Sequence, residues 1–224
     1  MTGWKLFGAI MTLTGSLATS NPATAQMRLD GADGPLILYN TETRVLRQEG
    51  VPLSEGFEAS ALKEFESEAA KTGYFGAMVV DRSADEIVFY FVGLHSVADA
   101  LAFALAKCRA LARDPLDCVE AARAVPSGII LAETGITTLS RLSVPLLLEF
   151  VGKTTTADGS VGVAISAMGH IAVSGPQPTA KAAGAAAVVN CKSFVDRSLA
   201  VASAEDKNIL SALGLDACRV VFVQ

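Results

Sequence analysis

The chain carries two copies of one sequence pattern, and this repeat limits the possible folds more than any other feature. Shifted by 93 residues, residues 37–53 align without a gap to residues 130–146, and seven of the seventeen positions are identical. Further matches join residues 76–79 to 162–165 and residues 96–108 to 179–191. Because a repeated sequence encodes a repeated supersecondary unit, we expect two similar modules in tandem.

Local signals predict the helices of the first copy. Phe57, Ala61 and Phe65 recur at helical spacing, which predicts a helix over 57–71. Ser96 is a good N-cap for an Ala- and Leu-rich helix over 97–113, and Asp114-Pro115 follows as a stop signal.

Short apolar runs bounded by polar turns predict the strands. In the first copy we expect strands at 36–39, 75–81, 86–92 and from 118 onward, with 43–48 pairing back on 36–39. In the second copy we expect strands at 161–167, 171–174 and 218–223, a helix over 180–192 and an added helical segment over about 198–213. The prediction is an α+β fold of two tandem β-β-α-β-like repeats, over residues 26–126 and 127–224.

The four cysteines are even in number, which favours two disulfides: they are Cys108, Cys118, Cys191 and Cys218. Three connectivities are possible, and the repeat favours one bridge in each copy, Cys108–Cys118 and Cys191–Cys218. A zinc site is the alternative, but no pair has C-x-x-C spacing and the histidines, His95 and His170, stand in no ligand pattern. Disulfides are typical of oxidising compartments.

The first 25 residues have the layout of a cleavable export signal. Lys5 is their only charge, residues 6–18 are mostly apolar, and Ala23 and Ala25 form the small-x-small pattern that precedes cleavage. The expected cut lies between Ala25 and Gln26. A membrane anchor is the alternative, but a spanning helix needs about 20 apolar residues. We therefore predict a periplasmic or secreted protein without stable membrane insertion after cleavage.

The charge of the exported part restricts its partners. Cleavage removes one lysine and no acidic residue, so the formal net charge changes from −5 to −6. Nucleic acids and anionic lipids bind basic patches, and no cluster of lysine and arginine is present. We expect no nucleic-acid partner.

Three stretches resemble a bacterial secreted domain of unknown function. They are residues 76–79, residues 98–108 and Cys218-Arg219-Val220-Val221, which correspond to a G-A-[IVM]-[AV] strand, an Ala-rich helix ending in Cys and a C-x-V-V strand. The tandem layout over 33–224 is similar to small exported proteins that often carry the label 5-aminolevulinate synthase. That label implies a pyridoxal-phosphate enzyme with a Schiff-base lysine and a phosphate cradle. No lysine here stands in such a setting, so we interpret the label as a misannotation.

Motifs for catalysis are weak in this sequence. Ser60-Ala61-Leu62-Lys63 matches S-x-x-K and Lys71-Thr72-Gly73 matches K-T-G, but in penicillin-binding enzymes these come from distant parts of the fold. A catalytic Cys–His pair would need a free thiol, whereas all four cysteines are expected to form disulfides. We therefore predict no catalytic residue, no cofactor and no metal site.

Our first hypothesis for function is a non-catalytic envelope protein that binds a partner protein, a peptide or a cell-wall component. The alternative is a small periplasmic enzyme with its site between the two repeats, and the synthase is a third possibility. A deep polar cleft between the copies, with converging His, Asp or Lys side chains, would favour the enzyme. An apolar patch would favour binding.

Overall fold

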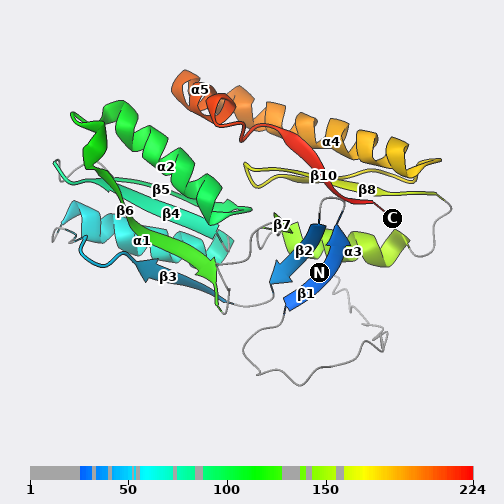
Figure 1. The fold of residues 1–224 in the computed structure, drawn as a ribbon, viewed down its shortest axis with the longest axis horizontal. Coiled ribbons are helices and arrows are strands. Elements are labelled where there is room, and N and C mark those ends of the chain that lie inside the picture. The colour runs from blue at the N-terminus through cyan, green and yellow to red at the C-terminus, as the bar shows by residue number, and fades with distance from the viewer. Residues whose placement is uncertain are drawn as a thin grey trace, which may run out of the picture.

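The computed structural model describes residues 26–31, 34–39, 42–51, 53, 56–72, 75–83, 88–127, 137–139, 143–154 and 159–223. Ala23 and Ala25 of the predicted cleavage motif lie outside these residues, and Gln26 opens the first strand. The elements form a mixed helix and sheet structure with three separate sheets (Figure 1).

A four-stranded antiparallel sheet forms the centre of the first half of the molecule. Its strand order is β3(Thr43–Arg47), β6(Cys118–Pro126), β4(Phe75–Asp81), β5(Val88–Leu94). The helices α1(Phe57–Thr72) and α2(Val97–Leu111) lie on opposite sides of this sheet (Figure 1). Strand β4 is buried along its whole length because Met78 and Val80 pack toward α1, while Val79 packs toward α2.

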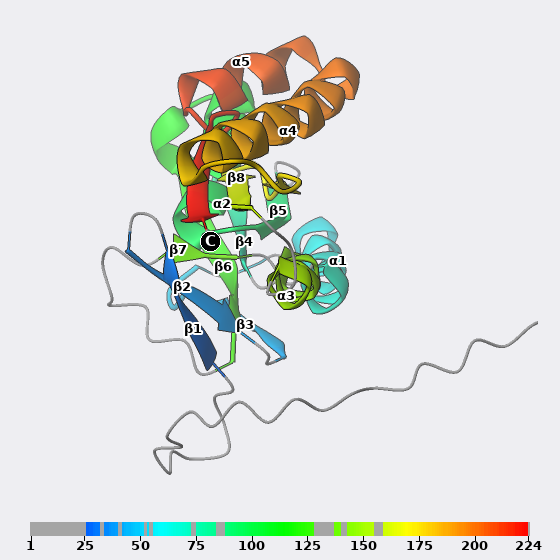
Figure 2. The same cartoon turned by 90° about the vertical axis from the view of Figure 1, so that its right-hand side faces the viewer.

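A three-stranded antiparallel sheet forms the centre of the second half. Its order is β10(Cys218–Val223), β8(Gly162–Ser166), β9(Ile171–Val173). The helix α4(Ala180–Val201) packs on Ala164 and Ala172, and α3(Ser143–Thr154) packs on the other face against Val163 and Ile165. Figure 2 shows the sheet between these two helices.

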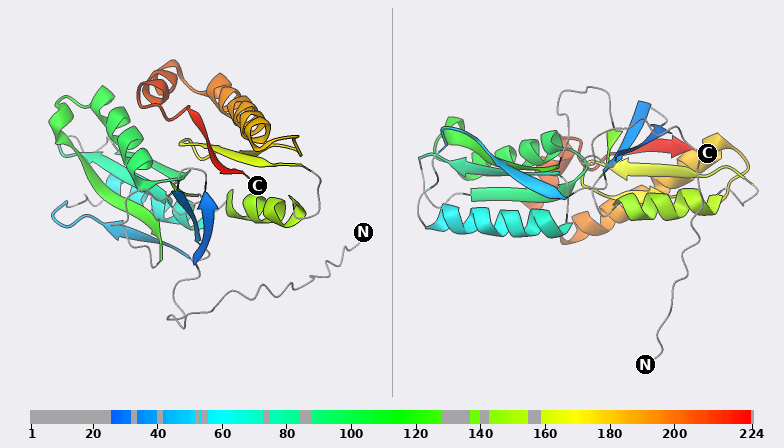
Figure 3. Two further views of the ribbon diagram at one scale, coloured as in Figure 1. Left: turned by 45° about the vertical axis from the view of Figure 1, so that its right-hand side comes forward. Right: turned by 90° about the horizontal axis from the view of Figure 1, so that it is seen from below.

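The two halves share one strand order and one placement of helices. Strands β6-β4-β5 with α2 correspond to β10-β8-β9 with α4. Seen from below, α1 and α3 lie one after the other along the same side of the molecule (Figure 3). The elements therefore agree with the expected β-β-α-β order in both halves, while the duplication itself stays a prediction.

The expected pairing of residues 43–48 with residues 36–39 is wrong. Strand β2(Gly34–Tyr39) pairs with β1(Gln26–Gly31) in an antiparallel hairpin and with β7(Thr137–Thr138) in parallel. Strand β3 pairs instead with β6, with Thr43 opposite Pro126. This pairing places Val45 against the apolar cluster under α1.

The helices of the second half also differ from expectation. The helix α4 continues to Val201, and the added segment is a separate helix, α5(Ala204–Ala212). Ser203 separates them, because its side chain accepts a hydrogen bond from the Asp206 amide as an N-cap. The helix α3 was not predicted.

Both predicted disulfides are present. The sulfur atoms of Cys108 and Cys118 are 1.97 Å apart, and those of Cys191 and Cys218 are 2.03 Å apart. Each bridge joins the helix on one face of the sheet to the strand that follows, β6 in the first half and β10 in the second. No described helix is long and apolar enough to cross a membrane.

Candidate functional site

A groove of about 530 Å³ runs beside β9, the strand at one edge of the second sheet. Because α3 and α4 cover opposite faces of that sheet, a groove lined by both helices and by β9 opens at the strand's outer edge. The lining residues from the helices are Leu146 and Glu149 of α3 and Asn190, Ser193, Phe194 and Arg197 of α4.

One wall of the groove is a stripe of α4 that carries three polar residues and Phe194. Its four residues lie at positions i, i+3, i+4 and i+7, which face the same side of a helix. The Asn190 amide nitrogen donates to the Val173 carbonyl oxygen at 2.7 Å, so this side chain reaches the edge of β9. The stripe therefore presents polar groups to the outer side of the sheet.

Arg197 is held in place by its own helix. Its Nε donates to the Ser193 carbonyl at 3.1 Å, and its guanidinium lies 4.5 Å from the centre of the Phe194 ring. Phe194 is 42 % exposed, and Leu146 on the opposite wall is also exposed. The groove thus combines a positioned cation with accessible apolar surface.

A histidine and a serine meet just beyond the lining of the groove. The Ser198 hydroxyl lies 3.0 Å from Nε2 of His170, and the His170 ring stacks against Phe194. Burial and the nearby Arg197 charge lower the pKa of His170, which keeps the imidazole neutral at pH 7. A neutral imidazole can accept the hydroxyl proton, so this pair has the elementary parts of a general base and its hydroxyl.

His95 lies at the junction of the two halves. It sits between β5 and α2, is 3 % exposed, and its Nε2 donates to the His170 carbonyl oxygen at 3.1 Å. The Thr138 hydroxyl donates to the His95 carbonyl. Burial lowers the pKa of His95 to about 4. His95 therefore joins the halves as a neutral donor.

We expect this burial to make stability depend on pH. An unfolded histidine takes up a proton at about pH 6.5, whereas folded His95 does so only near pH 4. The unfolded state binds more protons between these values, so stability falls as pH falls. His95 should account for a loss of about 1.6 kcal/mol between pH 6.5 and 5.

Urea unfolding of the wild type and of His95→Gln at several pH values measures this contribution. Glutamine keeps a donor but does not titrate, so its stability should decline less in this pH range. If the free energy of unfolding fell equally with pH in the two proteins, His95 would not be the source of this pH dependence.

The cavity between the halves is apolar. It has a volume of about 300 Å³ and is lined mainly by Phe91 and Phe103 of the first half and Met168, Leu210 and Leu215 of the second. Among the described residues that line it, the one charged residue is Asp206, which is paired with Lys107. Neither His95 nor His170 is among the described residues that line it.

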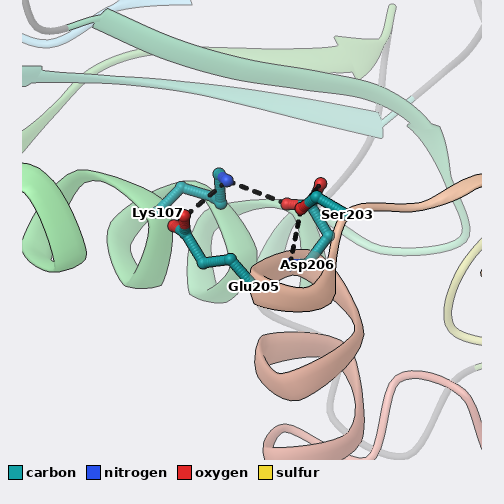
Figure 4. A network of polar contacts seen from close by, with 4 residues as sticks. All are labelled: Lys107, Ser203, Glu205 and Asp206. Carbon is teal, nitrogen blue, oxygen red and sulfur yellow. Dashed lines mark hydrogen bonds and ion pairs between the residues drawn. The ribbon is translucent and has the colours of Figure 1, made fainter.

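The added helix α5 fastens the second half to α2 of the first. Lys107 Nζ lies 2.9 Å from Asp206 and 3.1 Å from Glu205, and the Ser203 hydroxyl donates to Asp206 (Figure 4). Burial alone lowers the pKa of Lys107, but its bonds to Asp206 and Glu205 outweigh this and raise it. Burial raises the pKa of Asp206, yet the bonds from Lys107 and Ser203 lower it overall.

Removing this lysine should weaken the junction. Lys107→Met keeps most of the apolar stem, and we expect the free energy of unfolding to fall by about 1 kcal/mol. The lowered pKa of Asp206 and the raised pKa of Lys107 mean that this ion pair stabilises the fold between about pH 4 and pH 10. The stabilisation is lost below this range as Asp206 is protonated and above it as Lys107 is deprotonated. Lys181→Met, at an exposed position of α4, is the control in urea unfolding. Equal stabilities of the two variants would contradict the role of Lys107.

The other motifs considered in the sequence do not join the groove. Ser60 and Lys63 are exposed on α1, and Lys71 pairs with Glu68 at 2.9 Å. Gly73 lies outside the described residues. Among the residues that the structure describes, no group of three or more His, Cys, Asp or Glu could hold a metal ion.

Comparison with protein-family models, with curated proteins and with solved structures finds no match for this chain. The chemistry of the groove therefore has to be inferred from its own residues.

Proposed function

We propose that the protein is an exported, non-catalytic binding protein of the cell envelope and that the groove beside β9 is its ligand site. The observation that carries the proposal is the pairing of exposed apolar surface, at Leu146 and Phe194, with a cation held in place at Arg197. Sites for ligands are typically concave, largely apolar and fitted with a few placed polar groups. The two disulfides support export, because such bonds are rare in the cytosol.

Two charged residues, Glu149 and Arg197, are among the described lining of the groove, and the Arg197 guanidinium indicates one group that the ligand carries. Among the described residues, the Arg197 side chain makes one hydrogen bond, from Nε to the Ser193 carbonyl oxygen. Its terminal nitrogens therefore remain available to an acceptor. Guanidinium groups bind carboxylates in a bidentate manner. A protein segment, a free peptide or a cell-wall peptide with a carboxylate beside an apolar group would satisfy both walls.

We also infer that the two halves are copies of one secreted unit. The shared strand order and the disulfide at the same place in each half support this inference. The described residues that line the groove all lie in the second half, on α3, β9 and α4.

The mature form, residues 26–224, tests this function when it is used to capture ligands from the native envelope. We compare the wild type with Arg197→Glu and Leu146→Asp, which change the groove, and with Arg109→Glu, an exposed position on α2. The wild type and the Arg109 variant should retain the same components, and the groove variants should lose them. Equal capture by all four proteins would overturn the assignment of the groove.

The Ser198–His170 contact favours one alternative, a small hydrolase at the same groove. A nucleophilic serine would react with a fluorophosphonate probe, and Ser198→Ala would abolish the labelling. Labelling of Ser198 would overturn the non-catalytic function.

The synthase label has a separate test, since a pyridoxal-phosphate enzyme absorbs visible light and a colourless preparation would dismiss it.

A further inference from the structure

The outer edge of β9 carries backbone groups that point into the groove. In the ladder with β8, Ser166 N donates to the His170 carbonyl, and Ser174 N donates to the Gly162 carbonyl. Backbone groups alternate along an antiparallel strand, so residues 170, 172 and 174 face β8. Ile171 and Val173 therefore direct their N–H and C=O groups outward. The bond from Asn190 to the Val173 carbonyl shows the same direction.

Within the described part of the chain, three of these outward groups have no partner strand: the N–H and C=O of Ile171 and the N–H of Val173. Strand β9 pairs only with β8 among the described strands. An edge of this kind is a template for another strand, and proteins either cover it or use it for binding. Here the edge lies in a groove of about 530 Å³ that is lined by α3 and α4 as well as by β9.

The walls of the groove determine how such a segment would place its side chains. Ile171 and Val173 pack toward the cluster under α3, whereas Ala172 packs toward α4. Side chains of an added strand alternate in the same way. One set would contact Leu146 on α3, and the other would contact Phe194 and Arg197 on α4. The α3 side thus offers Leu146 to an apolar side chain, with Glu149 on the same wall, and the α4 side offers Arg197 to a carboxylate.

We propose that the groove binds an extended peptide segment, which adds to β9 as a fourth strand of the second sheet and places a carboxylate on Arg197. This inference rests on the proposed binding function and specifies its ligand class. Its distinguishing feature is that main-chain hydrogen bonds to Ile171 and Val173 supply part of the affinity, in addition to side-chain contacts.

The test uses a displayed library of random dodecapeptides selected on the mature protein. Enriched peptides are synthesised, and their affinities are measured for the wild type, Val173→Pro and Val173→Ala. Proline removes only the outward N–H, because Val173 does not donate to β8, and proline is tolerated at such edges. We expect about a tenfold loss of affinity with Val173→Pro and little loss with Val173→Ala. Arg197→Gln should weaken the binding of peptides that contain an acidic residue.

Two further measurements keep the test decisive if the proline variant fails to fold. Peptides methylated at alternate backbone nitrogens should lose affinity at one set of positions and keep it at the other. In the wild type, bound peptide should slow hydrogen exchange of the Ile171 and Val173 amides. Equal affinities of the proline and alanine variants, or unchanged exchange at these amides, would overturn strand addition.

The outcomes also separate this inference from the function on which it rests. If no peptide is enriched but capture from the envelope still depends on Arg197, strand addition is wrong and the binding function stands. If capture is also insensitive to Arg197, both proposals are wrong.

Discussion

Replacing Cys191 and Cys218 together by alanine is expected to lower the free energy of unfolding by about 3.5 kcal/mol. The same change at Cys108 and Cys118 is expected to lower it by about 2.7 kcal/mol. The difference follows from loop length, because the cysteines are separated by 27 residues in the second half and by 10 in the first. A longer closed loop removes more entropy from the unfolded chain. Urea unfolding of the mature, oxidised protein measures both values.

A control is needed because alanine also leaves a cavity at buried positions. Cys191 and Cys108 are both fully buried, so part of any loss could come from packing. The reduced wild type keeps all sulfur atoms and isolates the contribution of the bonds. We expect it to be less stable than either double variant, since it lacks both bridges. A larger loss from the first bridge than from the second would show that packing, and not loop closure, dominates.

The second bridge has a further consequence that the first lacks. The loop it closes contains α5, and α5 carries Glu205 and Asp206, the partners of Lys107. Opening this bridge therefore also loosens the contact between the halves. We expect the Lys107→Met change to cost less in the Cys191/Cys218 variant than in the wild type, because contacts within one network are not additive.

Elements with strong local signals could be predicted from the sequence. Strand β4 has the predicted bounds, and α2 begins after the predicted N-cap, Ser96. The disulfide pairing came from the repeat, which selected one of three connectivities. In each of these cases the information lies within a few residues or in the comparison of the two copies.

Long-range pairing could not be predicted in the same way. Strand β3 can form a hairpin with β2 or pair with β6, and both choices are compatible with its own residues. Only the tertiary context decides, because pairing with β6 packs the partly buried Val45 against the cluster under α1. The helix α3 was missed for a different reason. A proline inside a helix usually interrupts it, but Pro145 lies in the first turn of α3, where a proline removes no helical hydrogen bond.

The groove was missed because its residues come from three separate elements. The stripe from Asn190 to Arg197 has helical spacing, but the helix was expected to end at residue 192. A longer helix would have placed Phe194 and Arg197 on the face of Asn190. The wall formed by Leu146 and the edge of β9 depends on packing, and no local pattern encodes it.

Replacing Gly162 by alanine is expected to lower the free energy of unfolding by about 3 kcal/mol. A Cβ atom at Gly162 would lie 2.6 Å from the Ala183 carbonyl oxygen and 2.9 Å from the Gly184 nitrogen. Both atoms belong to the backbone of α4, so no side-chain rotation can relieve the overlap. The helix would have to move away from β8, which would disturb the cluster around Cys191.

Two other glycines serve as graded controls. Gly175 has no atom within 4 Å of an added Cβ, so Gly175→Ala should leave stability nearly unchanged. At Gly184 the nearest atom is a side-chain carbon of Val220, at 3.3 Å. That overlap is smaller, and alanine is a better helix former than glycine by about 1 kcal/mol, so the two effects should nearly cancel.

The matching glycine of the first copy extends the argument to the repeat. A Cβ at Gly76 would lie 2.6 Å from the Phe91 carbonyl oxygen, which belongs to β5 and not to a helix. Gly76→Ala should therefore destabilise the protein to a similar degree, by separating two strands instead of a strand and a helix. Thermal or urea unfolding of the four alanine variants distinguishes these cases. If Gly162→Ala and Gly175→Ala were equally stable, α4 would not be held against β8 as closely as this geometry requires.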